Sequence, residues 1–293
     1  MSGSKKLKSN EIFELIAQGR EGLSRAGIEE GQEECERIWM KLLGCARSAI
    51  YLEKHELALS GARERFLAIL ERRAQRIPLA YLLKEVDFWQ ETLFVDERCL
   101  IPRPETEILV EQVLKALGTD YGKSFSFLDI GTGSGAIAAA VLNACPSSRG
   151  TLLDISGEAL DVARENVKRY DLEDRAKLVC GDLFNALDAS DRFDWIVSNP
   201  PYLSETDLKE LQEELKVEPR QALDGGKDGL DFYRRIIREA SGRLNPGGRL
   251  ALELGQGQAE RVSKWLHEAG YDNIHRFKDH LQVERVILAQ RHS

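Results

Sequence analysis

The segment Asn199-Pro-Pro-Tyr202 combines residue types that can bind a small planar group bearing an NH₂. It follows the apolar run 193–197, which predicts that it lies where a buried strand ends and a loop begins. Each proline fixes its own φ and favours extended geometry in the residue before it. The Asn199 carboxamide, the nearby backbone carbonyls and the flat ring of Tyr202 would then form a receptor. A rigid loop without chemistry is the alternative that this segment alone leaves open.

A glycine-rich loop precedes this segment in the chain. Residues 124–130 read as a buried strand, followed at once by Gly131-Thr-Gly-Ser-Gly135 and a helix over 136–143. Glycines let the backbone approach a ligand closely, and a helix N-terminus offers free N–H groups. The G-x-G-x-G spacing differs from the G-x-G-x-x-G of nicotinamide enzymes, which disfavours a nicotinamide oxidoreductase.

Two acidic residues follow the next two predicted strands. Asp154 ends the first of them, where an acid accepts hydrogen bonds from a ribose. Asp182 follows the strand 176–180 and can accept from an adenine amino group, while Leu183 or Phe184 covers the ring. A glycine loop, an acid and a second acid beside apolar side chains match an adenosine-type cofactor.

Strands and helices alternate from residue 124 onward, which implies a mainly parallel sheet covered by helices on both faces. The predicted strands cover residues 124–130, 150–153, 176–180, 193–197, 249–254, 273–277 and 283–288. A polar segment, 204–223, interrupts the alternation and carries leucines at helical spacing.

The preceding part of the chain has a different pattern. Apolar residues recur at helical spacing over residues 9–76, and residues 86–101 then alternate as in a hairpin. We therefore expect a helical bundle at 1–77, a β-hairpin linker at 78–104 and an α/β domain at 105–293. The bundle carries no residues suited to chemistry, so structural padding and substrate recognition both remain open.

Charge is distributed unevenly along the 293 residues, whose formal net charge is −8. Residues 1–80 contain 14 Lys and Arg against 12 Asp and Glu, and the remainder contains 27 against 37. The acidity thus lies in the part that carries the Asn199 segment. Proteins that bind nucleic acid usually show a basic excess on the binding side, so a DNA or RNA substrate is disfavoured.

The cysteines and histidines indicate neither a disulfide framework nor a metal site. Both types number five, and neither shows paired or metal-ligand spacing. We expect free thiols, no metal and a reducing compartment. The N-terminal sequence lacks the features of a signal or transit peptide, and no segment is apolar enough to span a membrane, so a cytoplasmic protein is expected.

Four motifs resemble, in type and order, those of class I S-adenosylmethionine-dependent methyltransferases that modify planar nitrogens. They are Gly131-Thr-Gly-Ser-Gly135, Asp154-Ile-Ser156, Gly181-Asp182 and Asn199-Pro-Pro-Tyr202. Further runs resemble the peptide chain release factor glutamine methyltransferases: Pro78-Leu-Ala-Tyr81, Ile101-Pro-Arg-Pro-Glu-Thr-Glu107, Glu218-Pro219, Ala222-Leu-Asp-Gly-Gly226, Asp228-Gly-Leu230, and Glu253-Leu-Gly255 with Gln258. Lys84 departs from the pattern, because glycine is expected there.

The resemblance implies a Rossmann-like class I methyltransferase domain with a seven-stranded sheet, preceded by a helical bundle that recognises release factors and a linking β-hairpin. It also implies methyl transfer from S-adenosylmethionine, giving S-adenosylhomocysteine, to the glutamine of a release factor's Gly-Gly-Gln motif. A monomer without nucleic acid or membrane partners is expected.

The resemblance also assigns roles to residues. Cofactor binding falls to Gly131, Thr132, Gly133, Ser134, Gly135, Asp154, Ile155, Asp182, Leu183 and Asn199. Substrate binding and catalysis fall to Asn199, Pro200, Pro201 and Tyr202, with Arg103 and Glu105 as further substrate contacts. An amino-methyltransferase acting on adenine or guanine in RNA or DNA is the main alternative, because an exocyclic amino group is also planar. A nucleoside-binding module without turnover is a second.

Overall fold

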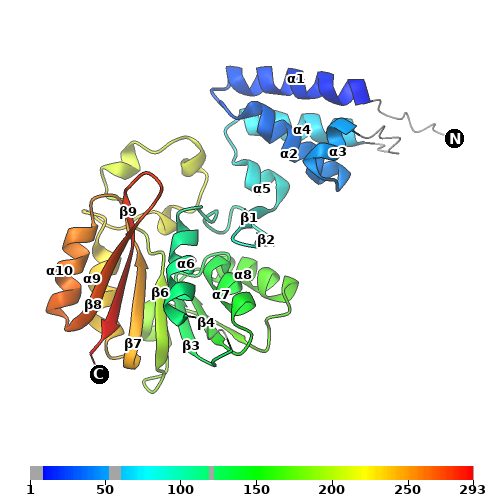
Figure 1. The fold of residues 1–293 in the computed structure, drawn as a ribbon. Helices are drawn as coiled ribbons and strands as arrows, with labels where there is room; N and C mark the ends of the chain where they lie inside the picture. Colours follow the sequence, from blue (N-terminus) through cyan, green and yellow to red (C-terminus); the bar gives the residue numbers. More distant parts are fainter. Residues whose placement is uncertain (1–8, 53–60, 119–121, 293) are drawn as a thin grey trace. The chain divides into compact units, whose positions relative to one another are not determined.

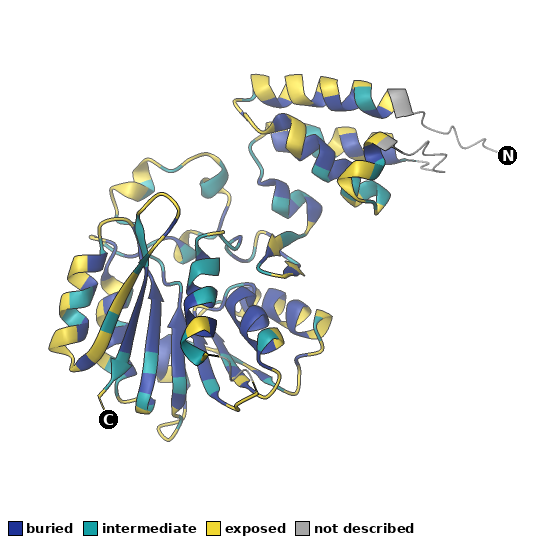
Figure 2. Cartoon of the chain, in the orientation of Figure 1, coloured by how far each residue is buried: buried dark blue, intermediate teal, exposed yellow. Residues whose placement is uncertain are grey.

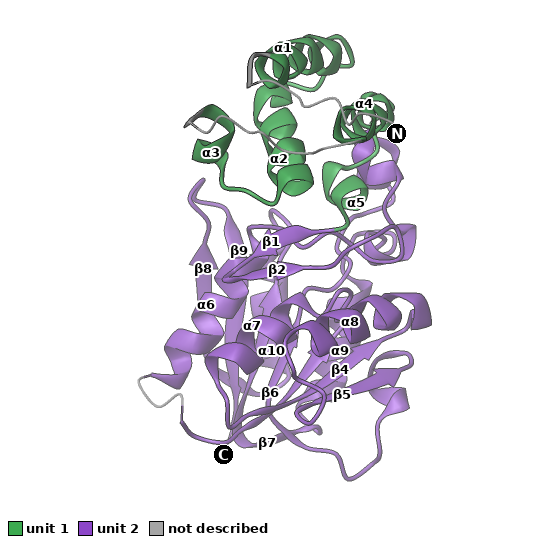
Figure 3. Ribbon diagram, turned by 90° about the vertical axis from the view of Figure 1, so that its right-hand side faces the viewer, with its two compact units in different colours: residues 1–84 green, residues 85–293 purple. Residues whose placement is uncertain are grey.

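The structure is a computed structural model, and it describes residues 9–52, 61–118 and 122–292. The chain forms two compact units, residues 1–84 and 85–293 (Figure 3). This division falls after the boundary expected at residue 77, because Leu79 and Leu83 pack into the core of the helical unit.

The first unit is helical, as predicted, with residues 53–60 of the expected helical region outside the described residues. Its helices are α1 (Ser9–Arg25), α2 (Gly31–Leu43), α3 (Arg47–Leu52), α4 (Ala62–Ala74) and α5 (Leu79–Leu83). Trp39 of α2 stacks on Phe66 of α4 with ring centroids 4.6 Å apart, and both side chains are fully buried. Burial of these aromatic rings and the surrounding aliphatic side chains stabilises the bundle.

A short antiparallel hairpin opens the second unit, formed by β1 (Val86–Phe88) and β2 (Glu91–Leu93). Phe88 and Leu93 are buried in the core of this unit. The N–H of Trp89 in the turn donates to Glu107 at 2.9 Å. The hairpin therefore belongs structurally to the α/β unit.

The second unit contains the predicted seven-stranded sheet (Figure 1). Its strands are β3 (Ser126–Ile130), β4 (Arg149–Asp154), β5 (Ala176–Cys180), β6 (Phe193–Ser198), β7 (Leu244–Glu253), β8 (Tyr271–Lys278) and β9 (Glu284–Arg291). The order across the sheet is β5-β4-β3-β6-β7-β9-β8, and β9 alone runs opposite to the other six strands.

Helices cover both faces of the sheet, and most residues of its central strands are buried, as their colour in Figure 2 shows. The helices are α6 (Thr106–Leu117), α7 (Ala136–Ala144), α8 (Gly157–Arg169), α9 (Asp231–Ala240) and α10 (Ala259–Glu268). Phe127 of β3 packs with α6 and α7 in one core, while its neighbour Leu128 packs with α9 and α10 in the other. This alternation is the two-residue period of a strand.

The strand order reverses at β3, which lies between β4 and β6. Open α/β sheets bind ligands at the carboxyl ends of strands beside such a reversal. Ile130 and Ser198 pair at this edge, and the Ser198 hydroxyl donates to the Ile130 carbonyl at 2.8 Å. The glycine loop and the Asn199 segment therefore leave the sheet side by side.

The segment between β6 and α9 forms three single 3₁₀ turns, although its leucines have helical spacing. These turns are Asp207–Lys209, Glu214–Lys216 and Arg220–Ala222. Leu208, Leu211 and Leu215 are only half-buried, so no continuous apolar face stabilises an α-helix. Nowhere in the described residues is there a helix long and apolar enough to cross a membrane.

Lys84 ends α5 in the left-handed region, with φ 58° and ψ 31°. Glycine adopts this conformation without the steric cost that a Cβ imposes. We expect Lys84→Gly to raise the free energy of unfolding of the helical unit by about 0.5–1 kcal/mol, measured by thermal denaturation. Lys84→Ala is the matched control, because it removes the side chain but keeps the Cβ. A glycine variant no more stable than the alanine variant would contradict the explanation.

Candidate active site

Asn199 leaves the end of β6 with one end of its carboxamide fixed. Its Nδ2 donates a hydrogen bond of 3.0 Å to the hydroxyl of Thr106, the first residue of α6. The carboxamide oxygen therefore remains the group that can accept a hydrogen bond from a ligand.

A first pocket of about 750 Å³, its open mouth included, lies along the ends of β3, β4, β5 and β6. Of the residues predicted to bind the cofactor, seven line it: Gly131, Gly133, Asp154, Ile155, Asp182, Leu183 and Asn199. Thr132, Ser134 and Gly135 are not among its lining residues.

The glycine loop is built for close backbone approach. Gly131, Gly133 and Gly135 all have positive φ, between 55° and 80°. Thr132 donates from its hydroxyl to Asp129 at 2.7 Å, so its side chain ties the loop to β3. Ser134 is buried, and its carbonyl accepts from Asn166 at 2.9 Å. The loop residues outside the pocket wall thus hold its shape.

Asp154 places a carboxylate at the end of β4. Its oxygens accept from the N–H groups of Gly133 at 2.8 Å and of Ser156 at 2.9 Å. Burial raises the pKa of this carboxyl, and the backbone N–H donors partly counter the rise. Since a carboxylate has about four acceptor positions, further hydrogen bonds to a ligand remain possible.

Asp182 and Leu183 form the far end of the first pocket. Asp182 accepts from Arg235 of α9 at 2.5 Å, so its carboxylate is held by an ion pair. Leu183 has φ 50° and lines the pocket, whereas Phe184 is buried in the sheet core. Leu183 and Phe184 were both predicted as residues that could cover an adenine ring, and of the two only Leu183 lines the pocket.

A second pocket, of about 1060 Å³ with its open mouth included, lies on the other side of Asn199. Its wall includes Tyr202 and three charged side chains, Arg103, Glu105 and Arg285. Burial raises the pKa of Tyr202 to about 12, so its hydroxyl is neutral at physiological pH.

Asn199 and Pro200 line both pockets, together with Leu100 and Ala222. Pro201 lines only the first pocket and Tyr202 only the second. Two ligands, one in each pocket, would therefore lie next to each other at the wall formed by Asn199 and Pro200.

Glu218 fixes the long segment after β6 against the chain before α6. Its side chain is buried and accepts from the N–H of Ile101 at 3.0 Å and from Arg103 at 2.5 Å. Arg103 therefore pairs with a carboxylate of its own chain. This contact keeps Ala222 and the neighbouring residues in the walls of both pockets.

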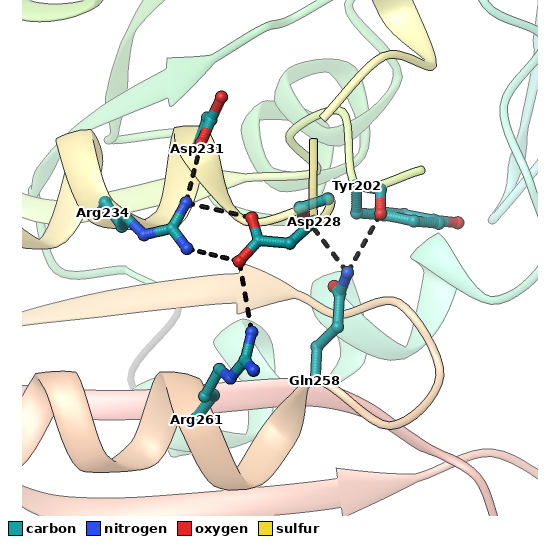
Figure 4. A network of polar contacts seen from close by, with 7 residues as sticks. Tyr202, Asp228, Asp231, Arg234, Gln258 and Arg261 are labelled. Atoms are coloured by element: carbon teal, nitrogen blue, oxygen red, sulfur yellow. Dashed lines mark hydrogen bonds and ion pairs between the residues drawn. The ribbon is translucent and has the colours of Figure 1, made fainter. Parts of the chain in front are cut away.

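Gln258 holds the other side of the Asn199 segment (Figure 4). Its Nε2 donates to the carbonyls of Tyr202 at 3.0 Å and Gly229 at 3.2 Å, and its Oε1 accepts from Gly255 at 2.9 Å. A Cβ at Gly229 would lie 2.3 Å from the Tyr202 carbonyl, so the loop approaches this closely only as glycine.

The same loop is tied to two helices by charge. Asp228 pairs with Arg234 of α9 and Arg261 of α10, as Figure 4 shows. Arg234 also lies over the ring of Trp265, 4.9 Å from its centroid. The loop that supports Tyr202 is thus anchored to α9 and α10 through Asp228.

Several site residues were not assigned a role from sequence. Thr106, Glu218, Glu253 and Gln258 were noted only as parts of motifs, and nothing in their spacing indicated contacts with the Asn199 segment. Phe232 and Ile236 line the first pocket from α9 and were given no role from the sequence. All five cysteines are free, and the described residues contain no cluster suited to a metal ion.

Comparison with known proteins gives consistent matches. The family model described as Methyltransferase small domain matches residues 104–262, and that described as PrmC N-terminal domain matches residues 14–83. A release factor glutamine methyltransferase of Caulobacter vibrioides is 38% identical over 270 residues, 92% of each chain. One of Rhodopirellula baltica is 36% identical over 285 residues, 96% of each chain. The crystal structure of a methyltransferase from Pyrococcus furiosus shares the fold, with a TM-score of 0.51 and 22% identity over 69% of this chain and 89% of that one.

Replacing Gln258 tests the support of the Tyr202 segment. We expect Gln258→Ala to lower the free energy of unfolding by about 1–3 kcal/mol, because three backbone groups lose their hydrogen-bond partner. Chemical denaturation measures the change. Gln256 is exposed two residues earlier, and Gln256→Ala should stay within about 0.5 kcal/mol of the parent. Equal effects of the two substitutions would show that the hydrogen bonds of Gln258 do not stabilise the Tyr202 segment.

Proposed function

The chain belongs to the release factor glutamine methyltransferase family, and we propose that it methylates the side-chain amide nitrogen of the glutamine in the Gly-Gly-Gln motif of release factors. The observation that carries the proposal is the wall formed by Asn199 and Pro200 between two pockets. One pocket fits a nucleoside-type methyl donor, and the other receives the amide.

The residues of the first pocket fit S-adenosylmethionine. Asp154 has acceptor capacity for ribose hydroxyls, and the positive-φ glycines leave room for a ligand against the backbone. Ile155, Leu183 and Ile236 provide an apolar surface for the adenine ring. Ile155 is 60% exposed, so its apolar side chain is accessible to a ligand in this pocket. When bound, the cofactor supplies an electrophilic methyl group on a sulfonium sulfur.

The Asn199 segment fits the amide acceptor. An amide nitrogen is a poor nucleophile, because its lone pair is delocalised into the carbonyl. The Asn199 carboxamide oxygen and the Pro200 carbonyl can accept its two N–H bonds and orient the nitrogen towards the wall. Tyr202 is half-buried in the second pocket and can pack against the amide plane. Acceptors on both N–H bonds also favour the positive charge that develops on the nitrogen.

The reaction balances without a strong general base. The new bond joins the methyl carbon to the amide nitrogen, and the electron pair of the broken bond returns to sulfur. The nitrogen becomes acidic as it is alkylated, so after methyl transfer one N–H bond leaves its acceptor and its proton passes to water. S-adenosylhomocysteine and N-methylglutamine are the products.

The protein partner follows from the same assignment. We assign release-factor recognition to the helical unit and place the enzyme in the cytoplasm, acting as a monomer. Nucleic acid is the less favoured substrate, because the residues after 80 carry 37 acidic against 27 basic side chains.

Parallel assays with a labelled methyl donor test the function. Release factor, tRNA and DNA are offered separately, and label is expected only on the release factor. Replacing the motif glutamine of the release factor by asparagine should abolish it. Label on nucleic acid with none on release factor would overturn the proposal.

Asn199→Ala tests the role of Asn199 in binding the substrate amide independently of cofactor binding. We expect turnover to fall by about 10²-fold or more, as on losing a positioned transition-state group, with cofactor affinity nearly unchanged. Asp154→Asn serves as the converse control, because it should weaken cofactor binding in calorimetry more than it lowers turnover at saturating cofactor. Loss of cofactor affinity alone in Asn199→Ala would refute the receptor assignment.

A further inference from the structure

Glu253 is a buried carboxylate beside Asn199. It ends β7, and the pairing of Ser198 with Leu252 places Asn199 and Glu253 next to each other at the ends of parallel strands. Glu253 is 1% exposed, and its Oε2 has no hydrogen-bond partner within the described part of the chain. An incompletely paired buried carboxylate costs folding free energy, so its presence calls for a functional reason.

Thr106 connects this carboxylate to the receptor. Its hydroxyl accepts from Asn199 Nδ2 at 3.0 Å. A threonine hydroxyl has one hydrogen to donate, and hydrogen bonding from Thr106 is the main influence that lowers the pKa of Glu253. Because an ionised carboxylate only accepts, the hydrogen bonds then run in one direction, from Asn199 through Thr106 to Glu253.

We propose that Glu253 is a positioning residue for methyl transfer, whose ionised carboxylate orders the chain through Thr106 so that Asn199 presents its carboxamide oxygen to the acceptor amide. This inference rests on the proposed function of the Asn199 segment. The two ends of a carboxamide have nearly the same shape, so hydrogen bonding decides which end faces the ligand. A protonated Glu253 can donate to Thr106 and no longer enforces this direction.

The carboxylate also strengthens the receptor electrostatically. Chains of hydrogen bonds polarise one another, so an anion at the far end makes the Asn199 oxygen a better acceptor. That effect is greatest when positive charge develops on the substrate nitrogen.

The surroundings of Glu253 set the pH at which it ionises. Burial raises its pKa to about 7, and the charge of Glu105 adds to the rise, while Arg285 and Arg103 oppose it together with Thr106. Tyr202 and Tyr233 also face the carboxylate, and its charge contributes to the raised pKa of each.

The raised pKa has a defined consequence for stability. Between its ordinary value of 4.5 and about 7, Glu253 is protonated in the folded protein and ionised in the unfolded chain. Its contribution to stability is therefore present below pH 4.5 and is lost as the pH rises through about 7. The active, ionised form is the less stable one.

Glu253→Gln tests the proposal, because it keeps the shape and removes the charge. We expect kcat to fall about 10-fold, as for groups that orient a ligating side chain from behind, with the KM for S-adenosylmethionine unchanged. The rise of kcat with pH that the parent shows as Glu253 ionises should be absent in the variant. Its melting temperature should exceed that of the parent at pH 8 by more than at pH 5. A purely structural residue would not combine lost turnover with gained stability.

Further variants complete the test. Thr106→Val should reproduce the loss of kcat, and the double variant should lose no more than either single one, because both act through one chain. Tyr271→Phe is the matched control: its buried hydroxyl also has no partner among the described residues, but it lies on β8, and kcat should not change. Unchanged kcat in Glu253→Gln, or additive losses in the double variant, would overturn the inference. The parent protein and Asn199→Ala are assayed in parallel. If the proposed function is wrong, the parent itself transfers no methyl group to the release factor, which distinguishes that outcome from a failure of the Glu253 proposal.

Discussion

The site depends on the fixed orientation of one carboxamide. Asn199 Nδ2 donates a hydrogen bond of 3.0 Å to Thr106, so the carboxamide oxygen remains available to accept a hydrogen bond from the substrate. The backbone on either side of it is held by Ser198 of β6, which donates to the Ile130 carbonyl of β3, and by Gln258, which donates to the Tyr202 carbonyl. A displacement of about 1 Å at a reacting group can cost 10²-fold in rate, so such redundant anchoring is expected of a receptor for a weak nucleophile.

The two pockets are made from parts of the chain that are far apart in sequence. The ends of β3, β4, β5 and β6 form the floor of the first pocket. Residues within 98–105 and 199–223 contribute to the walls of both pockets. Glu218 joins these outer segments by accepting from Ile101 and Arg103. Because the long segment lacks an α-helix of its own, this buried ion pair and the loop anchored by Asp228 take over the role of helical packing.

The sequence predicted those features that depend on local pattern. Apolar runs located the strands, and the glycine loop, Asp154 and Asn199 were correctly placed at their ends, because parallel strands align their carboxyl edges. Contacts set by tertiary packing were not predictable. Arg235 pairs with Asp182 from 53 residues away and Thr106 meets Asn199 from 93 residues away, and no spacing rule links them. The left-handed φ of Leu183, which turns it into the pocket, likewise has no signal in its residue type.

One buried carboxylate lies near each of the two pockets, and the stability that each contributes at low pH is lost around neutral pH. Asp129 lies behind the glycine loop and Glu253 behind Asn199, each has one oxygen without a partner among the described residues, and burial raises each pKa to about 7. Their stabilising contribution is lost as the pH rises through that value. A cation bound nearby favours the ionised forms and so lowers both pKa values, which couples its binding to proton release and restores stability. The sulfonium of the proposed methyl donor carries such a positive charge, so its binding is expected to favour the ionised forms.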